Sequence, residues 1–216
     1  RGAYLSDPLP ISWTPSEYIS GTNEIIIVRD EIKRPIDVET AFKIALNPEY
    51  HRDGDGFIPS KQLYIPVNKE DVLQYGVVDA SRADDIVSQI NIDLTDKSRL
   101  TKSELMVIEM LKENKWKRPI YFAVTVGDSY YLGLNDHFEL TGMAYQIMPV
   151  STEGKGASVN TAEMYDNMMH KFSYGNIADS TIYLDENTLR MCRTHRMMFS
   201  QLIAALIEEN DTVRAK

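Results

Sequence analysis

Apolar residues recur along the chain with two kinds of spacing, one typical of strands and one typical of helices. Short β-branched or alternating apolar runs predict strands at residues 24–29, 62–67, 87–94, 120–126 and 144–150. Apolar residues at helical spacing predict helices at residues 37–46, 69–75, 101–115, 161–172 and from 185 or 187 onward. Strands that alternate with helices predict an α/β or mixed α+β fold, with helices packed on a mostly parallel sheet.

Local signals refine three of these elements. Thr101 and Glu104 have the spacing of a capping box, so a helix should begin between them. The segment 120–126 follows Pro119 and is rich in apolar residues, which predicts a central strand buried on both faces. Pro66 lies within the strand predicted at 62–67, and a proline there favours an edge position.

The pattern also predicts two units. Residues 1–180 form the α/β domain, and residues 181–216 form a helical extension, because the last helix has its own apolar face. The chain begins at Arg1 without a methionine and ends at Lys216 inside a helical pattern. We therefore expect an excised piece of a longer protein, with part of the domain upstream of Arg1.

Composition and charge narrow the function. The 216 residues are 43% hydrophobic, which is enough for a packed core, and the net charge of −9 disfavours nucleic acid as a partner. The longest nearly apolar stretch, residues 197–207, is interrupted by Ser200 and Gln201, whereas a membrane span needs about 20 apolar residues. Cys192 is the single cysteine, so no internal disulfide can form.

No catalytic motif is complete. His51, Arg52 and Asp53 resemble a kinase triplet, but Ile58 stands where that motif needs asparagine. The segment from Asp53 to Gly56 resembles a calcium loop, yet Phe57 and Ile58 break the EF-hand pattern. Asp53 and Asp55 therefore remain candidates for a looser cation site. The preferred interpretation of this segment is a hairpin turn. We predict no catalytic residue and no cofactor.

Aromatic residues supply the other candidates for a binding site. Trp13, Trp116, Tyr130 and Tyr131 could stack on sugar rings, although aromatic residues in an α/β domain more often pack in the core or at its rim. These four are the candidate ligand-binding residues.

Three segments carry a resemblance to a known family: Lys117-Arg-Pro-Ile-Tyr-Phe-Ala123, Tyr131-Leu-Gly-Leu134 and Leu140-x-Gly-Met-Ala-Tyr145. The chain resembles the C-terminal soluble domain of a bacterial family of multi-pass membrane proteins of formerly unknown function. That family is similar to protein O-mannosyltransferases, with the type C glycosyltransferase architecture. The resemblance implies that the active site lies in an absent N-terminal membrane half. It also implies a last helix that leads into a tetratricopeptide-like arm.

The resemblance and the lack of a catalytic motif favour one function over two alternatives. We expect a non-catalytic accessory domain of a membrane glycosyltransferase, on the periplasmic face of the inner membrane. Its partners would be its own transmembrane domain and an acceptor protein or glycan. The alternatives are a stand-alone protein-interaction module and a hydrolase with an unrecognised site, for which His51, Asp53 and Asp55 are the first residues to suspect.

Overall fold

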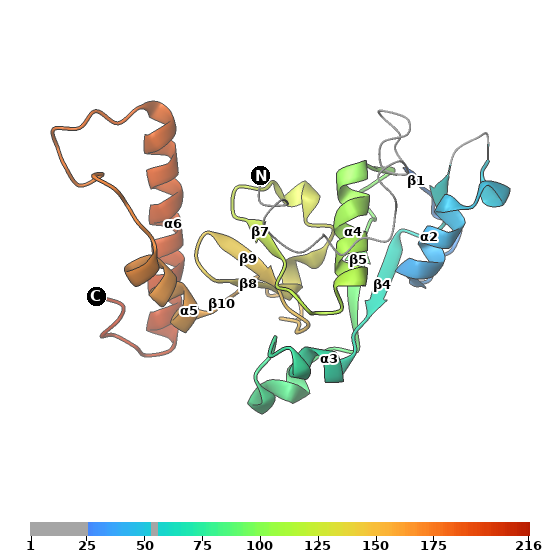
Figure 1. The fold of residues 1–216 in the computed structure, drawn as a ribbon, viewed down its shortest axis with the longest axis horizontal. Coiled ribbons are helices and arrows are strands. Elements are labelled where there is room, and N and C mark those ends of the chain that lie inside the picture. Colours follow the sequence, from blue (N-terminus) through green and yellow to red (C-terminus); the bar gives the residue numbers. More distant parts are fainter. Residues whose placement is uncertain (1–25, 53–55) are drawn as a thin grey trace.

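The computed structural model describes residues 26–52 and 56–216, which fold into helices around three small mixed sheets (Figure 1). The strands are β1 (Ile26–Val28), β2 (Ile36–Asp37), β3 (Phe57–Ile58), β4 (Gln62–Pro66), β5 (Gln89–Asp93), β6 (Arg99–Leu100), β7 (Tyr121–Ala123), β8 (Phe138–Leu140), β9 (Ala144–Ile147) and β10 (Ser158–Val159). The helices are α2 (Val38–Leu46), α3 (Lys69–Gln74), α4 (Lys102–Asn114), α5 (Thr161–Asp166) and α6 (Glu186–Glu208). Shorter helical turns are η2 (Pro48–Tyr50), η3 (Ala80–Asp85), η4 (Asp128–Tyr130), η5 (Leu134–His137) and the π-helical η6 (Asn167–Lys171).

The predicted mixture of helices and strands is confirmed, but a single mostly parallel sheet is wrong. Each sheet combines a parallel pair, such as β1 with β3, and an antiparallel pair, such as β1 with β6. The physical reason is clearest between β8 and β9, which are joined by residues 141–143 alone. So short a connection can only return the chain antiparallel, because a parallel pair needs a crossover of a dozen or more residues.

The strand predicted at 62–67 exists as β4, but its edge position is wrong. β4 lies in the middle of the order β2-β4-β5. The proline is tolerated because β2 pairs only with Leu63 and Tyr64, so Pro66 extends past the end of β2. There its missing N–H interrupts no ladder hydrogen bond to β2.

The predicted central strand at 120–126 is also wrong, and β7 is a short terminal strand in the order β10-β8-β9-β7. Phe122 is buried, whereas Tyr121 is 45% exposed and Ala123 is exposed. The sequence alternates with period two, so one face of β7 carries Phe122 and the other carries Tyr121 and Ala123. Tyrosine and alanine at these positions occupy the solvent side of a half-buried strand.

The predicted helices are confirmed, and their N-termini show why they begin where they do. The Thr101 hydroxyl accepts a hydrogen bond from the Glu104 N–H, and the Glu104 side chain accepts one from the Thr101 N–H, which completes the capping box of α4. Asp185 caps α6 through the N–H of Thr188. Asp37 precedes α2 at the N-cap position, but its side chain makes no capping hydrogen bond.

Two apolar clusters account for most of the core. The larger one joins α2 and α4 to strands of all three sheets and includes Ile58, Leu63, Ile92 and Ile108. The second packs α6 against α5, η6 and β8, and its buried members are Leu140, Met164, Met168, Met198, Leu202 and Leu206. The division of the chain between residues 180 and 181 remains a prediction. Within the described residues, no helix combines the length and apolar character that a bilayer crossing requires.

His137 makes the stability of the fold depend on pH. The side chain is buried, and its Nδ1 lies 2.7 Å from the Val150 carbonyl oxygen. Burial lowers the pKa of His137, although the Val150 hydrogen bond opposes this shift. The unfolded chain therefore takes up a proton first as the pH falls below about 6.5, and the free energy of unfolding should decrease there by up to about 1.4 kcal/mol per pH unit.

Urea unfolding at pH 7.5 and 5.5 checks this expectation. The matched variant is His137→Asn, whose amide can donate to Val150 but does not titrate. The loss of stability between the two pH values should be larger in the wild-type chain than in this variant. Equal losses would show that His137 is not the group responsible.

Candidate functional site

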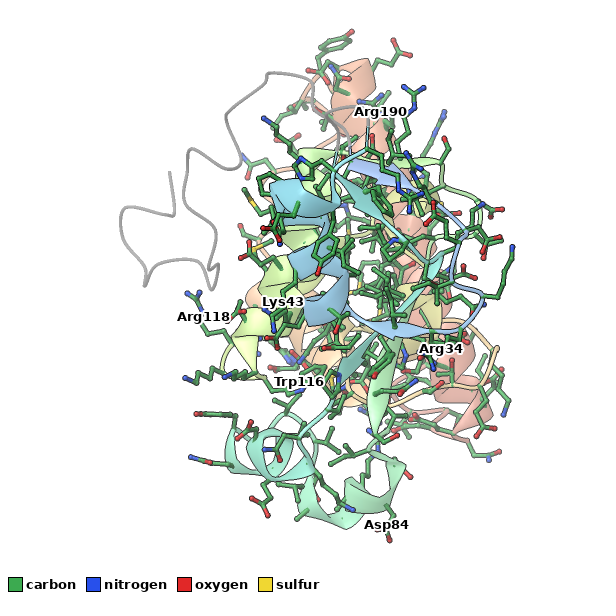
Figure 2. All side chains as sticks on the ribbon, turned by 90° about the vertical axis from the view of Figure 1, so that its right-hand side faces the viewer. Arg34, Lys43, Asp84, Trp116, Arg118 and Arg190 are labelled. Atoms are coloured by element: carbon green, nitrogen blue, oxygen red, sulfur yellow. The ribbon has the colours of Figure 1, made fainter. Side chains whose placement is uncertain are left out.

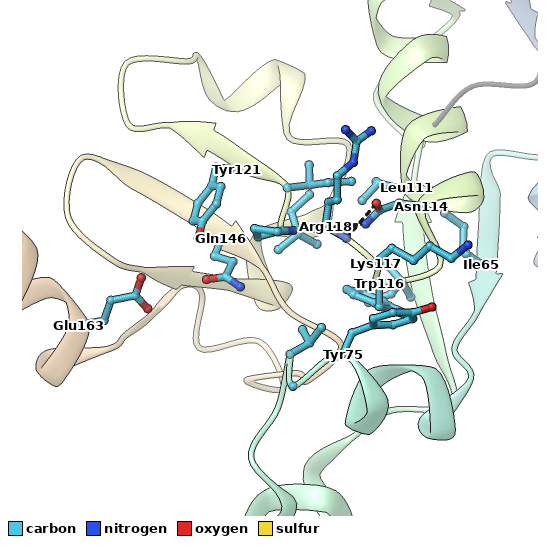
Figure 3. Close-up of a pocket in the computed structure, with 16 residues that line it drawn as sticks. Ile65, Tyr75, Leu111, Asn114, Trp116, Lys117, Arg118, Tyr121, Gln146 and Glu163 are labelled. Atoms are coloured by element: carbon cyan, nitrogen blue, oxygen red, sulfur yellow. Dashed lines mark hydrogen bonds between the residues drawn. The ribbon is translucent and has the colours of Figure 1, made fainter. Parts of the chain in front are cut away.

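A cavity of about 320 Å³ lies where four parts of the fold meet (Figure 3). Its walls come from the β4–β5 pair, the C-terminal end of α4 with the following segment 116–121, β9, and the residues after α3. Glu163 of α5 closes one side. These segments are far apart in the sequence, so the cavity forms only when the sheets and helices pack.

The floor of this pocket is apolar. By the floor we mean the six branched aliphatic side chains of its lining: Ile65, Val77, Ile90, Leu111, Ile120 and Ile147. Asn114 also lines the pocket, but its amide is occupied by the backbone of Arg118, donating to the carbonyl oxygen at 2.6 Å and accepting from the N–H at 3.3 Å. The floor therefore suits an apolar group, since a hydroxyl buried against it would lose its hydrogen bonds to water without replacement.

The rim is aromatic and polar. In Figure 3, Tyr75, Trp116 and Lys117 lie at one end of the pocket, and Tyr121, Gln146 and Glu163 lie at the other. Tyr121 and Gln146 are paired opposite each other on β7 and β9, so their side chains share one face of the sheet. Burial and the nearby Glu163 carboxylate raise the pKa of Tyr121, which keeps its hydroxyl protonated as a hydrogen-bond donor.

The backbone at Trp116 has an unusual conformation. Lys115 and Trp116 both have positive φ angles, 45° and 63°, directly after the last residue of α4. Such angles cost a residue with a Cβ atom about 1 kcal/mol or more. The hydrogen bonds of Asn114 to Arg118, together with the Lys117 N–H donated to the Asn114 carbonyl at 3.0 Å, hold this turn closed. The turn places Trp116 between the larger apolar cluster and a third, smaller cluster formed by Val72, Val78, Met148 and Val150.

Replacing Lys115 with glycine should therefore stabilise the fold. Lys115 occupies the left-handed position after a helix, where glycine is the favoured residue, and its side chain is exposed. We expect Lys115→Gly to raise the free energy of unfolding by about 0.5–1 kcal/mol, measured by urea denaturation. Lys102→Gly, in the first turn of α4 with an ordinary helical φ, should instead destabilise the chain by a similar amount. A loss of stability in Lys115→Gly would contradict the assigned strain.

A second cavity, of about 550 Å³, is also lined by Trp116. The two cavities share Ile65, Leu111 and Trp116. We call the two together the Trp116 groove. Figure 2 shows Trp116, Lys43 and Arg118 on one side of the molecule.

The sequence-predicted ligand residues do not gather in one place. Trp116 lines the groove, whereas Tyr130 is 51% exposed outside it. Tyr131 is buried, with its ring 5.0 Å from that of Phe138 and its hydroxyl donating to the Val126 carbonyl oxygen, so it offers no surface to a ligand. Trp13, Asp53 and Asp55 lie outside the described residues.

The described residues offer no support for catalysis at His51. Its Nε2 is hydrogen-bonded to the Ala45 carbonyl oxygen at 3.0 Å. Among residues 26–52 and 56–216, no group of three histidine, cysteine or acidic side chains could hold a metal ion. Asp53 and Asp55, the other residues suspected for the hydrolase alternative, lie outside these ranges.

Sequence reasoning missed most of the residues that line the groove. Tyr75, Lys117, Tyr121, Gln146 and Glu163 come from separate elements, and none belongs to a motif. One local signal was available, because Tyr121 alternates with the apolar residues of its strand and therefore points to the solvent side.

The fold is a mixed α/β domain, and the Trp116 groove is its candidate ligand site. Comparison with family models then places it: the model described as TMEM260-associated domain 2 matches residues 1–169, and the chain belongs to this family. Comparison with curated proteins and with solved structures gives no significant match.

Proposed function

We propose that this chain is a non-catalytic accessory domain of a membrane glycosyltransferase similar to protein O-mannosyltransferases. The observation that carries the proposal is the family match over residues 1–169, whose description names a domain associated with TMEM260. The resemblance of residues 117–145 to the soluble domain of such enzymes supports the same assignment. In this proposal, transmembrane helices of the same protein tether the domain at the periplasmic face of the inner membrane.

The role of the domain in this proposal is to bind the acceptor. The Trp116 groove supports this role, since an apolar floor with an aromatic and polar rim is typical of a ligand site. The catalytic groups and the donor site belong to the membrane part of the protein.

Activity assays on the isolated 216-residue chain test the lack of catalysis. With a polyprenyl-phosphate sugar and an acceptor protein, the chain should transfer no sugar, and it should hydrolyse no aryl glycoside. Transfer or hydrolysis activity that co-purifies with the chain would contradict the proposal.

A second candidate function is a protein-interaction module, and α6 carries the observation that favours it. Met197, Ile203 and Ile207 are exposed on this helix. Large apolar residues gathered on a surface often mark a contact site. If α6 binds the partner, Ile203→Ser with Ile207→Ser should abolish capture of the transmembrane part in a pull-down, whereas Tyr75→Ala should leave capture unchanged. The opposite pattern would assign the contact to the Trp116 groove.

A further inference from the structure

The Trp116 groove is elongated, and this shape limits its ligands. Its two cavities share Ile65, Leu111 and Trp116, so a ligand that fills both must pass Trp116. A compact monosaccharide can occupy only one of them. An extended chain, whose side chains on one face recur about every 6.6 Å, can fill both.

The floor of the first cavity favours an apolar side chain over a sugar. Six branched aliphatic residues form it, and the amide of Asn114, which also lines the cavity, is bonded to the Arg118 backbone. A sugar would bury hydroxyl groups there without partners, and each would lose hydrogen bonds to water. A leucine or isoleucine side chain loses nothing in the same place and gains burial.

The two cavities of the groove carry different charged side chains. Lys117 stands beside the indole, is exposed, and forms no ion pair with any residue that the structure describes. The second cavity is lined by Asp37, Asp71 and two further carboxylates. Those two are already matched, Glu39 by Lys43 at 2.8 Å and Glu113 by Lys112 at 2.6 Å.

Asp37 and Asp71 are thereby left as the acceptors for a cation. Neither forms an ion pair with a residue in the described ranges. Two lysines line the same cavity, Lys112 and Lys115, and Lys112 is paired with Glu113. The first cavity thus combines an apolar floor with Lys117, Arg118 and Glu163, and the second cavity carries the carboxylates of Asp37 and Asp71. A neutral glycan has no charged group to pair with them.

We propose that the Trp116 groove binds an extended polypeptide segment with an apolar, an acidic and a basic side chain at alternate positions. The apolar side chain enters the first cavity, the acidic one pairs with Lys117, and the basic one lies over Asp37 and Asp71. Alternate positions of an extended chain point to the same face, so one strand presents all three. This inference rests on the proposed function, because it names the acceptor class that the domain would recognise.

A titration with defined peptides tests the inference on the 216-residue chain. The probe is the acetylated, amidated peptide Ser-Leu-Ser-Glu-Ser-Lys-Ser, and the readout is the indole N–H signal of Trp116 in ¹⁵N–¹H correlation spectra. The indole signal should shift in a saturable manner. A peptide with serine in place of the glutamate and lysine should bind about five-fold or more weakly, the loss expected for one to two solvent-accessible ion pairs.

Charge reversal distinguishes specific pairing from general attraction. Lys117→Glu should weaken binding of the probe by about five-fold or more, and a probe with lysine in place of glutamate should recover the affinity for that variant. Tyr75→Ala, at the rim, should weaken binding, whereas Tyr130→Ala, which removes another exposed tyrosine outside the groove, should not. Unfolding curves confirm that each variant is folded.

Several outcomes would overturn the inference. These are no shift with any peptide, equal affinity for the charged and uncharged peptides, or a saturable shift with mannotriose in place of the peptide. The proposed function fails on a different readout, sugar transfer by the isolated chain, so the two failures are distinguishable.

Discussion

Gly133→Ala is expected to lower the free energy of unfolding by about 2–4 kcal/mol. Gly133 has a φ of 75°, and a Cβ atom built there would lie 2.7 Å from the Asp93 Cβ and 3.0 Å from the Asp93 nitrogen. The Asp93 N–H donates to the Leu132 carbonyl oxygen at 3.0 Å, so the end of β5 and the 132–133 turn cannot separate without losing this hydrogen bond. Backbone strain of about 1 kcal/mol and overpacking of about 1–3 kcal/mol therefore add.

A second glycine separates the strain from the overpacking. Gly175 has a φ of 58°, but a Cβ atom there would meet no heavy atom within 4 Å. Gly175→Ala should therefore cost only about 1 kcal/mol in urea denaturation. An equal loss of stability in both variants would show that the close approach of Asp93 does not affect the free energy of unfolding. That result would contradict the packing described for β5.

Leu206→Ala is expected to cost about 2–5 kcal/mol, the range for a large-to-small change in a packed core. Leu206 is fully buried in the cluster that joins α6 to Met164 and Met168, so the substitution leaves a cavity between the last helix and the rest of the fold. The result also bears on whether residues 181–216 form a separate unit. A helix that packs through Leu206 should unfold together with the domain, in one transition.

The adjacent residue provides the control. Ile207 is 57% exposed, so Ile207→Ala should change the free energy of unfolding by no more than about 0.5 kcal/mol. Circular dichroism at 222 nm and tryptophan fluorescence, followed through the same urea titration, should give coincident curves for the wild-type chain. Two separate transitions, with Leu206→Ala affecting only one of them, would instead favour the boundary between residues 180 and 181.

The sequence predicts the start of a helix where hydrogen bonds between neighbouring residues determine that start. The capping box of Thr101 and Glu104 predicts the start of α4, because its hydrogen bonds join residues three positions apart. For α6 the sequence predicts a cap at Asp185 or Asn187, and the structure shows that it is Asp185. Helix positions depend on contacts within one or two turns, and those contacts are readable from the sequence.

Sheet order was not predictable, because it depends on contacts between distant segments. β7 was expected at the centre of a sheet and lies at its end, and Pro66 was expected at an edge and lies in a central strand. In both cases the decisive fact is how far the neighbouring strand extends. β2 stops opposite Tyr64, and no property of Pro66 itself determines that end.

The site was predictable only in part for the same reason. Trp116 was a candidate because indole rings bind ligands, but nothing in the sequence brings it near Tyr75 or Glu163. The left-handed conformation of Lys115 and Trp116 also has no signal in the sequence, since neither residue is glycine or asparagine. Tyr131 has the same side chain as Tyr130, and only its packing against Phe138 shows that it belongs to the core.

Steady-state kinetics of the full membrane protein test the proposed binding of the acceptor by the Trp116 groove. Sugar transfer to an acceptor polypeptide should be compared between Tyr75→Ala and Tyr130→Ala, which remove one exposed tyrosine inside the groove and one outside it. Loss of a binding contact made equally in the ground and transition states raises KM and leaves kcat unchanged. We expect Tyr75→Ala to raise the acceptor KM several-fold at constant kcat. Tyr130→Ala should have the KM and kcat of the wild type. A fall in kcat at constant KM, or no difference between the two variants, would contradict the proposed binding.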